Sequence, residues 1–391
     1  MVKFRKIIVA TVGIILVIAG ILILVVQWFN WDRYRDDIAI WISSLTSQEV
    51  SIDGLIEIKL FPSPRVILTG VSVRDSEDEL DEQYVHIGSV TARFDLINIF
   101  SGDLVLDQLW VNQLQFQVPA DRDGQLEKRP RKHSDSPLKF LTPVLIPRRF
   151  EMTDSEIEFI DSVSNVVEII QIQDFTLETL SNQLTSNIKI IASFKGDSLQ
   201  LEGVIGDLPR WIDGNPAEIS VQYKFGDMGG ELLGSVGQIL DDGLFSLRYS
   251  VHGDHFATMA NLFKLDLVGI EMGSFISQGK LEGTWDSVSF DEVTGSITGR
   301  DFHMDFSGSV LDMFRQNIVQ MDFRARSASF DLLHLFGHEF SSFDGITNIS
   351  AKLYGESGRS FGLKDVDISS RSSVFEIKAT GEVSALGTNP Q

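Results

Sequence analysis

Apolar and polar residues alternate along most of the chain after residue 46, and this period of two constrains the fold more than any other feature. Clear runs cover residues 50–52, 56–60, 104–106, 114–118, 188–194, 219–225, 245–251, 349–353 and 375–379. Because successive side chains of a strand point to opposite faces, each run predicts a strand with one apolar face. Gly, Asn and Asp separate the runs and no long helical pattern intervenes. The sequence therefore predicts a mostly β fold with antiparallel strands.

Some segments interrupt the alternation. The pattern slips near Gln108, which predicts a β-bulge. Residues 127–150 are polar and rich in proline and are predicted to be a linker with a short helix around 138–144. The KRPRKH stretch at 128–133 is predicted to be a solvated loop rather than a contact for phosphate groups. Further short helices are predicted at 254–263 and 330–336. We expect these helices to plug or flank the sheet.

A 23-residue apolar run occupies residues 7–29, with Gln27 as its one strongly polar residue. About 20 such residues cross a hydrocarbon core, so a transmembrane helix is predicted. Residues 1–6 carry Lys3, Arg5 and Lys6, which places the N-terminus in the cytoplasm by the positive-inside rule. A cleaved signal peptide is the alternative, but the run ends in QWFNW without a small-residue cleavage site.

Residues 30–45 are predicted to form a juxtamembrane amphipathic helix. Ile38, Trp41, Ile42 and Leu45 share one face at a spacing of three to four, and Asn30 or Asp32 can cap the start. A β domain is then expected over 46–126, and a repeating β body over 151–391.

A weak repeat marks the second half of the chain. Similar short segments begin with glycine after an alternating run, at Gly203, Gly234, Gly283, Gly308 and Gly381. Several of the gaps are close to multiples of 24–25 residues, enough for two strands with their turns. Glycine within a strand marks a bend or bulge. The repeat predicts a stack of hairpins forming an elongated, curved groove rather than a closed barrel.

Such a sheet has one apolar face and no second layer in the sequence to cover it. A long uncovered apolar face beside a membrane anchor fits acyl chains as its ligand. As groove-lining positions we select Phe194, Val221, Phe245 and Phe375.

The composition argues against several other functions. With 33 Lys and Arg against 55 Asp and Glu, the net charge is −22, so nucleic acid is not expected as a partner. There is no cysteine, and no phosphate-binding or catalytic motif appears. We expect no enzyme activity, no cofactor and no metal site. The pairs His334–His338 and His252–His255 lack further ligands, and the acidic run within 75–82 lacks EF-hand spacing.

Residues 50–75 read VSIDGLIEIKLFPSPRVILTGVSVRD, and a second patterned stretch covers residues 87–126. These stretches, and more loosely segments after residue 200, resemble the AsmA-like proteins of the Gram-negative envelope. Matching positions are Gly54, Pro62, Ser63, Pro64, Gly70, Val71, Val73, Val90, Ala92, Gly102, Asp121 and Gly124. The family's usual Thr-Gly-Arg before the first strand is Thr46-Ser47-Gln48 here. The chain also ends without a clear cap, as expected of a short or truncated member.

The resemblance implies a protein of the inner membrane with one span and a periplasmic body. It also implies a β-groove similar to those of chorein-type lipid-transfer proteins, with roles in outer-membrane biogenesis and phospholipid movement between the two membranes. The leading hypothesis is a conduit for phospholipid acyl chains. The alternative is an assembly factor that contacts outer-membrane or other envelope proteins through its sheet edges. A membrane-tethered enzyme is the third hypothesis, and no sequence feature favours it.

Overall fold

The computed structural model describes residues 29–46, 49–74, 83–95, 98, 101, 105–119, 147–161, 166–179, 185–212, 214–237, 243–262, 273–284, 287–313, 318–329, 344–355, 361–374 and 376–386. The chain forms two compact units, Met1–Lys195 and Gly196–Gln391. Both are built mainly from strands, which confirms the mostly β prediction. Each unit is described by itself.

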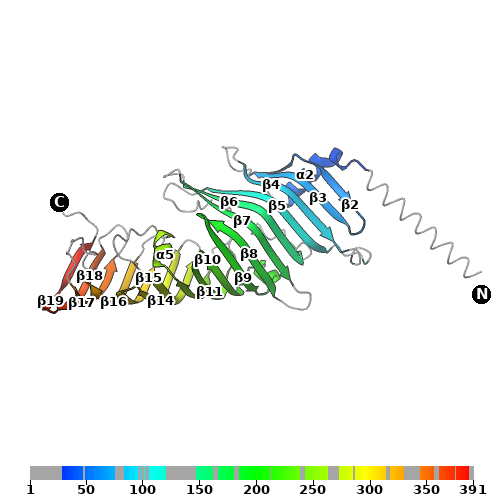
Figure 1. The fold of residues 1–391 in the computed structure, drawn as a ribbon. Helices are drawn as coiled ribbons and strands as arrows, with labels where there is room; N and C mark the ends of the chain where they lie inside the picture. The colour runs from blue at the N-terminus through cyan, green and yellow to red at the C-terminus, as the bar shows by residue number, and fades with distance from the viewer. Residues whose placement is uncertain are drawn as a thin grey trace, which may run out of the picture. The chain divides into compact units, whose positions relative to one another are not determined.

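The first unit begins with helical turns and continues as a sheet. Its elements are η1 (Trp31–Tyr34), α2 (Arg35–Thr46), β1 (Glu49–Ile52), β2 (Ile56–Lys59), β3 (Arg65–Arg74), β4 (Gln83–Phe94), β5 (Leu106–Pro119), β6 (Arg149–Asp161), β7 (Val166–Thr179) and β8 (Ser186–Phe194). β1 and β2 pair with opposite halves of β3, and β4 lies along its other edge. From β3 each strand pairs with the next as far as β8 (Figure 1).

The prediction that all strands are antiparallel is wrong at one pair. β5 and β6 run parallel, with Gln108 opposite Arg149 and Pro119 opposite Ile160. Parallel neighbours need a crossover connection of a dozen or more residues rather than a hairpin. The sequence between β5 and β6 is long enough for one. Alternation assigns each side chain to a face but carries no information on strand direction. The predicted slip near Gln108 is confirmed as a register shift between Arg93 and Phe94, where β4 pairs with β5.

The predicted amphipathic helix is confirmed as η1 and α2. Ala39 is buried against β1 and β3, and Ile38 and Ile42 pack on the same cluster. Trp41 was predicted to share this face, but it does not pack on the cluster, and 63% of its surface is exposed. The capping prediction is also wrong for η1: Asn30 makes no side-chain cap, and the Asp32 carboxylate accepts a hydrogen bond from the Ile56 backbone NH at 3.0 Å.

The second unit is a meander of strands with short helices. Its elements are β9 (Asp197–Ile205), α4 (Leu208–Ile212), β10 (Ala217–Phe225), β11 (Met228–Val236), β12 (Phe245–Gly253), α5 (Phe256–Leu262), β13 (Ser274–Thr284), β14 (Ser287–Thr298), β15 (Phe302–Leu311), β16 (Ile318–Ser329), β17 (Asp344–Gly355), β18 (Phe361–Ser372) and β19 (Glu376–Leu386). Each strand from β9 to β18 pairs antiparallel with the next (Figure 1). In the described pairings β19 contacts only β18, so this sheet does not close into a barrel.

The repeat glycines mark alternate strands of this sheet. Gly203, Gly234, Gly283, Gly308 and Gly381 lie on β9, β11, β13, β15 and β19, which confirms a repeat of two strands. Gly308 has φ +154°, and a Cβ there would lie 2.1 Å from the Gln320 carbonyl oxygen on β16. A side chain cannot fit at that distance, so glycine is required by both the backbone and its neighbour.

Several predicted features lie outside the described residues. They are the run at 7–28, the acidic run at 75–82, most of the 127–150 linker with its helix, the helix at 330–336, and the residues Gly102, Asp121, Gly124, His334, His338 and Phe375. Within the part of the chain that is described, no helix has the length and apolar character to cross a membrane. The predicted helix at 254–263 is confirmed as α5. α4 was not predicted, because five residues are too few to show a helical period.

Candidate functional site

The register of the second unit aligns apolar residues into a row that crosses every strand from β9 to β19. Each member faces the next across a strand pair or a bulge, and none carries a charge. We call the face that holds this row the apolar face. In strand order the row is Gly203, Val221, Leu232, Tyr249, Gly279, Val293, Gly308, Met321, Leu353, Leu363 and Val383.

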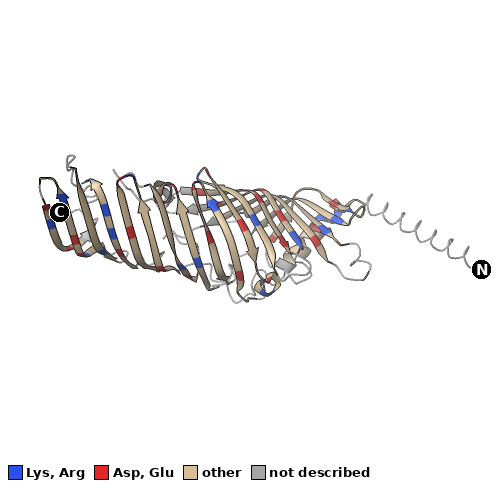
Figure 2. Ribbon diagram, turned by 60° about the horizontal axis from the view of Figure 1, so that its bottom comes forward, with Lys and Arg blue, Asp and Glu red and all other residues tan. Residues whose placement is uncertain are grey.

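The residues next to this row point to the opposite face and are polar. The corresponding row runs Glu202, Gln222, Glu231, Ser250, Gln278, Thr294, Ser307, Asp322, Lys352 and Lys364. Charged residues of both signs are spread along the strands (Figure 2). The period of two is therefore preserved across the whole unit, and it separates a polar face from an apolar one.

The apolar face is only partly covered in the described part of the unit. Val221 and Phe245 are each 6% exposed, whereas Leu232, Leu281 and Phe323 are half-buried. α5 packs against this face, where the Phe256 ring meets the Phe275 ring edge-on at 5.5 Å between centroids. The half-buried positions are therefore the ones that an apolar ligand could contact.

Aromatic rings on the apolar face lie over glycines of neighbouring strands. A Cβ on Gly230 would be 2.7 Å from the Tyr223 hydroxyl oxygen, and one on Gly295 would be 2.4 Å from Cζ of Phe306. The same arrangement places the Phe275 ring over Gly253. Because a ring can occupy the space that the missing side chain leaves, it lies along the sheet instead of standing upright.

Two tyrosines place hydroxyl groups within this face without adding charge. The Tyr223 hydroxyl donates to the Ser250 carbonyl oxygen at 3.1 Å, and the Tyr249 hydroxyl lies 3.3 Å from Ser277 Oγ. Burial, together with the neighbouring Tyr249, raises the pKa of Tyr223 to about 12. Both phenols are hydrogen-bonded, and Tyr223 stays neutral at physiological pH, so the face remains uncharged.

The first unit has an apolar face of its own. Ala192 and Ile172 are opposite each other and buried, and the Phe150 and Phe175 rings meet at 5.6 Å. Phe194 lies on this face, two residues after Ala192 on β8. The α2 helix covers the β1–β3 end of the face.

Of the four residues selected as groove lining, the structure brings Val221 and Phe245 to one face. Phe194 belongs to the first unit, and Phe375 lies outside the described residues. The half-buried Leu281 and Phe323 were missed. Leu281 has only Gly279 and Gly283 two residues away on its face. Phe323 does alternate with apolar residues, but the charged residues and serines of β16 hid that pattern.

The family-like positions in the first unit form a corner and a turn. Gly54 lies between β1 and β2, where a Cβ would be 2.4 Å from the Thr69 carbonyl oxygen; Gly70 opposite has φ +62°. The Pro62-Ser63-Pro64 turn joins β2 to β3, and the Pro64 carbonyl oxygen accepts from the Phe94 NH at 2.9 Å. These residues have structural rather than chemical roles.

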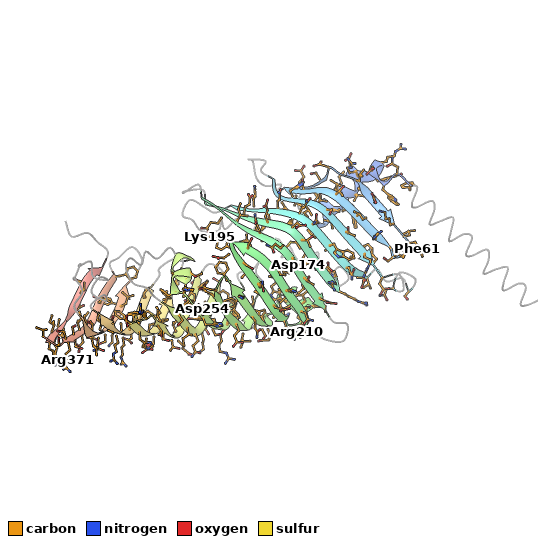
Figure 3. The ribbon with its side chains drawn as sticks, viewed as in Figure 1. Phe61, Asp174, Lys195, Arg210, Asp254 and Arg371 are labelled. Atoms are coloured by element: carbon orange, nitrogen blue, oxygen red, sulfur yellow. The ribbon has the colours of Figure 1, made fainter. Side chains whose placement is uncertain are left out.

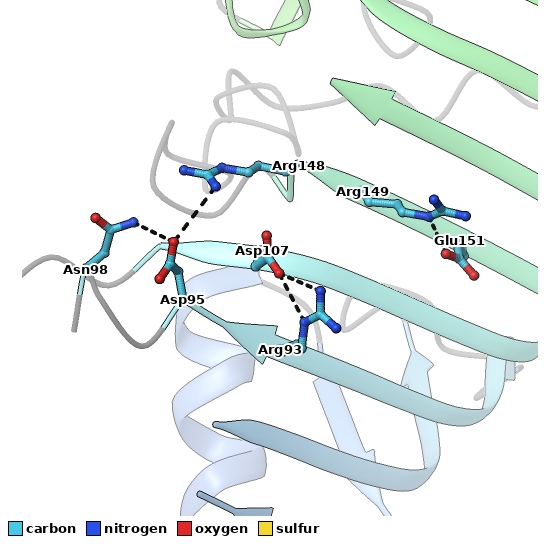
Figure 4. A network of polar contacts seen from close by, with 7 residues as sticks. All are labelled: Arg93, Asp95, Asn98, Asp107, Arg148, Arg149 and Glu151. Atoms are coloured by element: carbon cyan, nitrogen blue, oxygen red, sulfur yellow. Dashed lines mark hydrogen bonds and ion pairs between the residues drawn. The ribbon is translucent and has the colours of Figure 1, made fainter. Parts of the chain in front are cut away.

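Polar contacts tie together the strand ends beside the parallel pair (Figure 4). The Arg93 guanidinium donates to one Asp107 carboxylate oxygen from two nitrogens, at 3.0 and 2.6 Å. Arg148 lies 3.8 Å from Asp95, which also accepts from Asn98, and Arg149 pairs with Glu151. Every charge in this network has a partner, which is typical of a structural network.

The described residues contain no group of three or more side chains placed to hold a metal ion. His255 Nδ1 lies 2.8 Å from the Asp227 carboxylate. Burial raises the pKa of Asp227, but hydrogen bonds from Thr258 and His255 outweigh it and lower the pKa overall. A hollow of about 570 Å³ on β14–β18 has charged residues in its wall, where Lys352 pairs with Asp365 at 2.9 Å.

Comparison with known proteins gives a match for the N-terminal part of the chain. Residues 1–129 match the model described as the AsmA family, so this part of the chain is AsmA-like. Neither a curated protein nor a solved structure gives a significant match.

Proposed function

We propose that this AsmA-like protein is anchored in the inner membrane by residues 7–29 and holds phospholipid acyl chains on the apolar face of its periplasmic body. In this proposal it supports phospholipid movement between the inner and outer membranes and the biogenesis of the outer membrane. It has one span and a cytoplasmic N-terminus. It carries out no chemical step and needs no cofactor.

One observation carries the proposal: an uncharged row continues across all strands from β9 to β19, and its half-buried members leave apolar surface accessible. Apolar surface of this extent needs an apolar partner. An acyl chain fits such a row because it needs no hydrogen bonds, and the polar opposite face stays in water. The AsmA-like N-terminal part and the open sheet support an envelope protein with a groove.

The experiment is photo-crosslinking of the full chain in membranes. A photoreactive phenylalanine analogue replaces Leu281 or Phe323 on the apolar face, or Ile276 on the polar face, which is 58% exposed. After irradiation of cells grown with radioactive phosphate, we expect phospholipid to be linked at 281 and 323 and not at 276. Equal labelling of the two faces would contradict acyl-chain binding.

The second candidate is an assembly factor acting through an open sheet edge. β19 pairs only with β18 among the described residues, and Ile377 and Val383 on it are 49% and 39% exposed. An exposed edge can add a further strand from a partner. Crosslinks from β19 to envelope proteins, with none to lipid on the apolar face, would favour this function.

A further inference from the structure

Large apolar side chains are exposed in unusual number at the N-terminal end of the described chain. Of the 15 such exposed side chains among the described residues, six lie between residues 29 and 61. They are Phe29, Tyr34, Ile40, Trp41, Leu55 and Phe61, which we call the edge patch. Singly exposed apolar residues need no explanation, but a cluster of them marks an interaction surface.

The edge patch comes from adjoining elements of the first unit. Phe29 stacks on Tyr34 at 5.6 Å, and the hydrogen bond from the Ile56 NH to Asp32 holds η1 against the start of β2, beside Leu55. β1 and β2 form the outer edge of the sheet, because both pair with β3 along the side that β4 does not occupy. Phe61 follows β2 at this edge (Figure 3).

The packing of α2 is what exposes its two patch residues. Ala39, with Ile38 and Ile42 beside it, faces the core, so Ile40 and Trp41 point away from the sheet, 67% and 63% exposed. A helix that needed only to cover β1–β3 would carry polar residues there. The outer side of α2 therefore suits a second, apolar contact.

The chain itself indicates what makes that contact. The edge patch begins at Phe29, the last residue of the 23-residue apolar run. It contains Trp and Tyr, whose rings combine apolar and polar parts and are enriched at the headgroup level of bilayers. The charges between Phe29 and Ile40 nearly cancel, with Arg33 and Arg35 against Asp32, Asp36 and Asp37. Anionic lipids would therefore not repel this segment strongly.

We propose that the edge patch lies in the headgroup–acyl interface of the same bilayer that holds residues 7–29. The inference rests on the proposed membrane anchor and goes beyond it. It places the β1–β2 edge and the outer side of α2 at the membrane surface, so that the first unit is docked on the bilayer rather than tethered at a distance.

The test uses single-cysteine variants of the full chain, which has no cysteine of its own. Ile40→Cys, Trp41→Cys and Phe61→Cys are labelled with an environment-sensitive fluorophore. Ile276→Cys is the control. Ile276 is also an exposed apolar residue, but it lies on the polar face of the second unit. Each variant is reconstituted in vesicles of phosphatidylcholine with a minor fraction of phosphatidylglycerol, with or without a nitroxide-bearing lipid as quencher.

We expect blue-shifted emission and several-fold stronger lipid quenching at 40, 41 and 61 than at 276. Flotation with the vesicles combined with quenching no stronger than at 276 would overturn the edge patch and leave the anchor intact. A blue shift without lipid quenching would mean that another protein chain covers the patch, and would also overturn the proposal. Failure to float with the vesicles would overturn both the anchor and the docking.

Discussion

Replacing Gly308 with alanine tests whether the repeat glycines are required by the sheet. Gly308 lies within β15 at φ +154°, and an added Cβ would stand 2.1 Å from the Gln320 carbonyl oxygen and 2.8 Å from Cα of Met321. Both of these neighbours are main-chain atoms. They cannot swing aside as the tip of a flexible side chain could, so β15 and β16 must move apart.

The expected loss of stability follows from these two effects. A non-glycine residue in such a backbone region costs about 1–3 kcal/mol, and forcing apart packed atoms costs about 1–3 kcal/mol more. Alanine also restricts the unfolded chain, which offsets about 0.4–1 kcal/mol. We therefore expect Gly308→Ala to lower the free energy of unfolding by about 2–4 kcal/mol. With a urea m-value of about 2–3 kcal/mol per M, the midpoint should fall by about 1 M.

Gly381→Ala is the matched control. It replaces the corresponding repeat glycine on β19, where an added Cβ would meet nothing within 4 Å. Its midpoint should stay unchanged or rise slightly, because only the effect on the unfolded chain remains. Pulse proteolysis in urea measures both midpoints. Equal midpoint shifts for the two variants would refute the argument that close approach, rather than glycine itself, matters at 308.

Three further predictions concern individual side chains. The pKa of Tyr223 in the fold is about 12, above its unfolded value. The stabilisation from its neutral phenol is therefore fully present below about pH 10 and is lost as the pH rises towards 12. Tyr223→Phe should remove this loss of stability at alkaline pH, and an ultraviolet absorbance titration of the variant should lack one high-pH step. The pKa of Asp227 is lowered in the fold, so its contribution to stability is present above its ordinary pKa and is lost as the pH falls through its pKa in the folded protein. The melting temperatures of the native chain and of Asp227→Asn should therefore converge in acid. Arg93→Ala should lower the free energy of unfolding by about 1–2 kcal/mol in a denaturant titration, because it leaves the half-buried Asp107 without its guanidinium. Lys378→Ala, at an exposed ion pair, should leave the midpoint of the same titration unchanged.

Much of the fold was predictable because the signals are local. Alternation at 219–225 and 245–251 predicted β10 and β12, and the helical spacing at 30–45 predicted η1 and α2. The repeat glycines predicted a two-strand unit. Each of these follows from the geometry of one segment and requires no knowledge of its neighbours.

The tertiary structure decided what depends on pairing. The parallel direction of β5 and β6 depends on pairing between strands far apart in the sequence, which periodicity does not encode. Register turned separate apolar stripes into one row across β9–β19, and it distinguished the buried Val221 and Phe245 from the half-buried Leu281 and Phe323. Packing on β1–β3 likewise turned Trp41 outward, because Ala39 is small enough to take the position against the sheet. Which apolar residues can meet a ligand or a membrane is therefore a property of the assembled sheet.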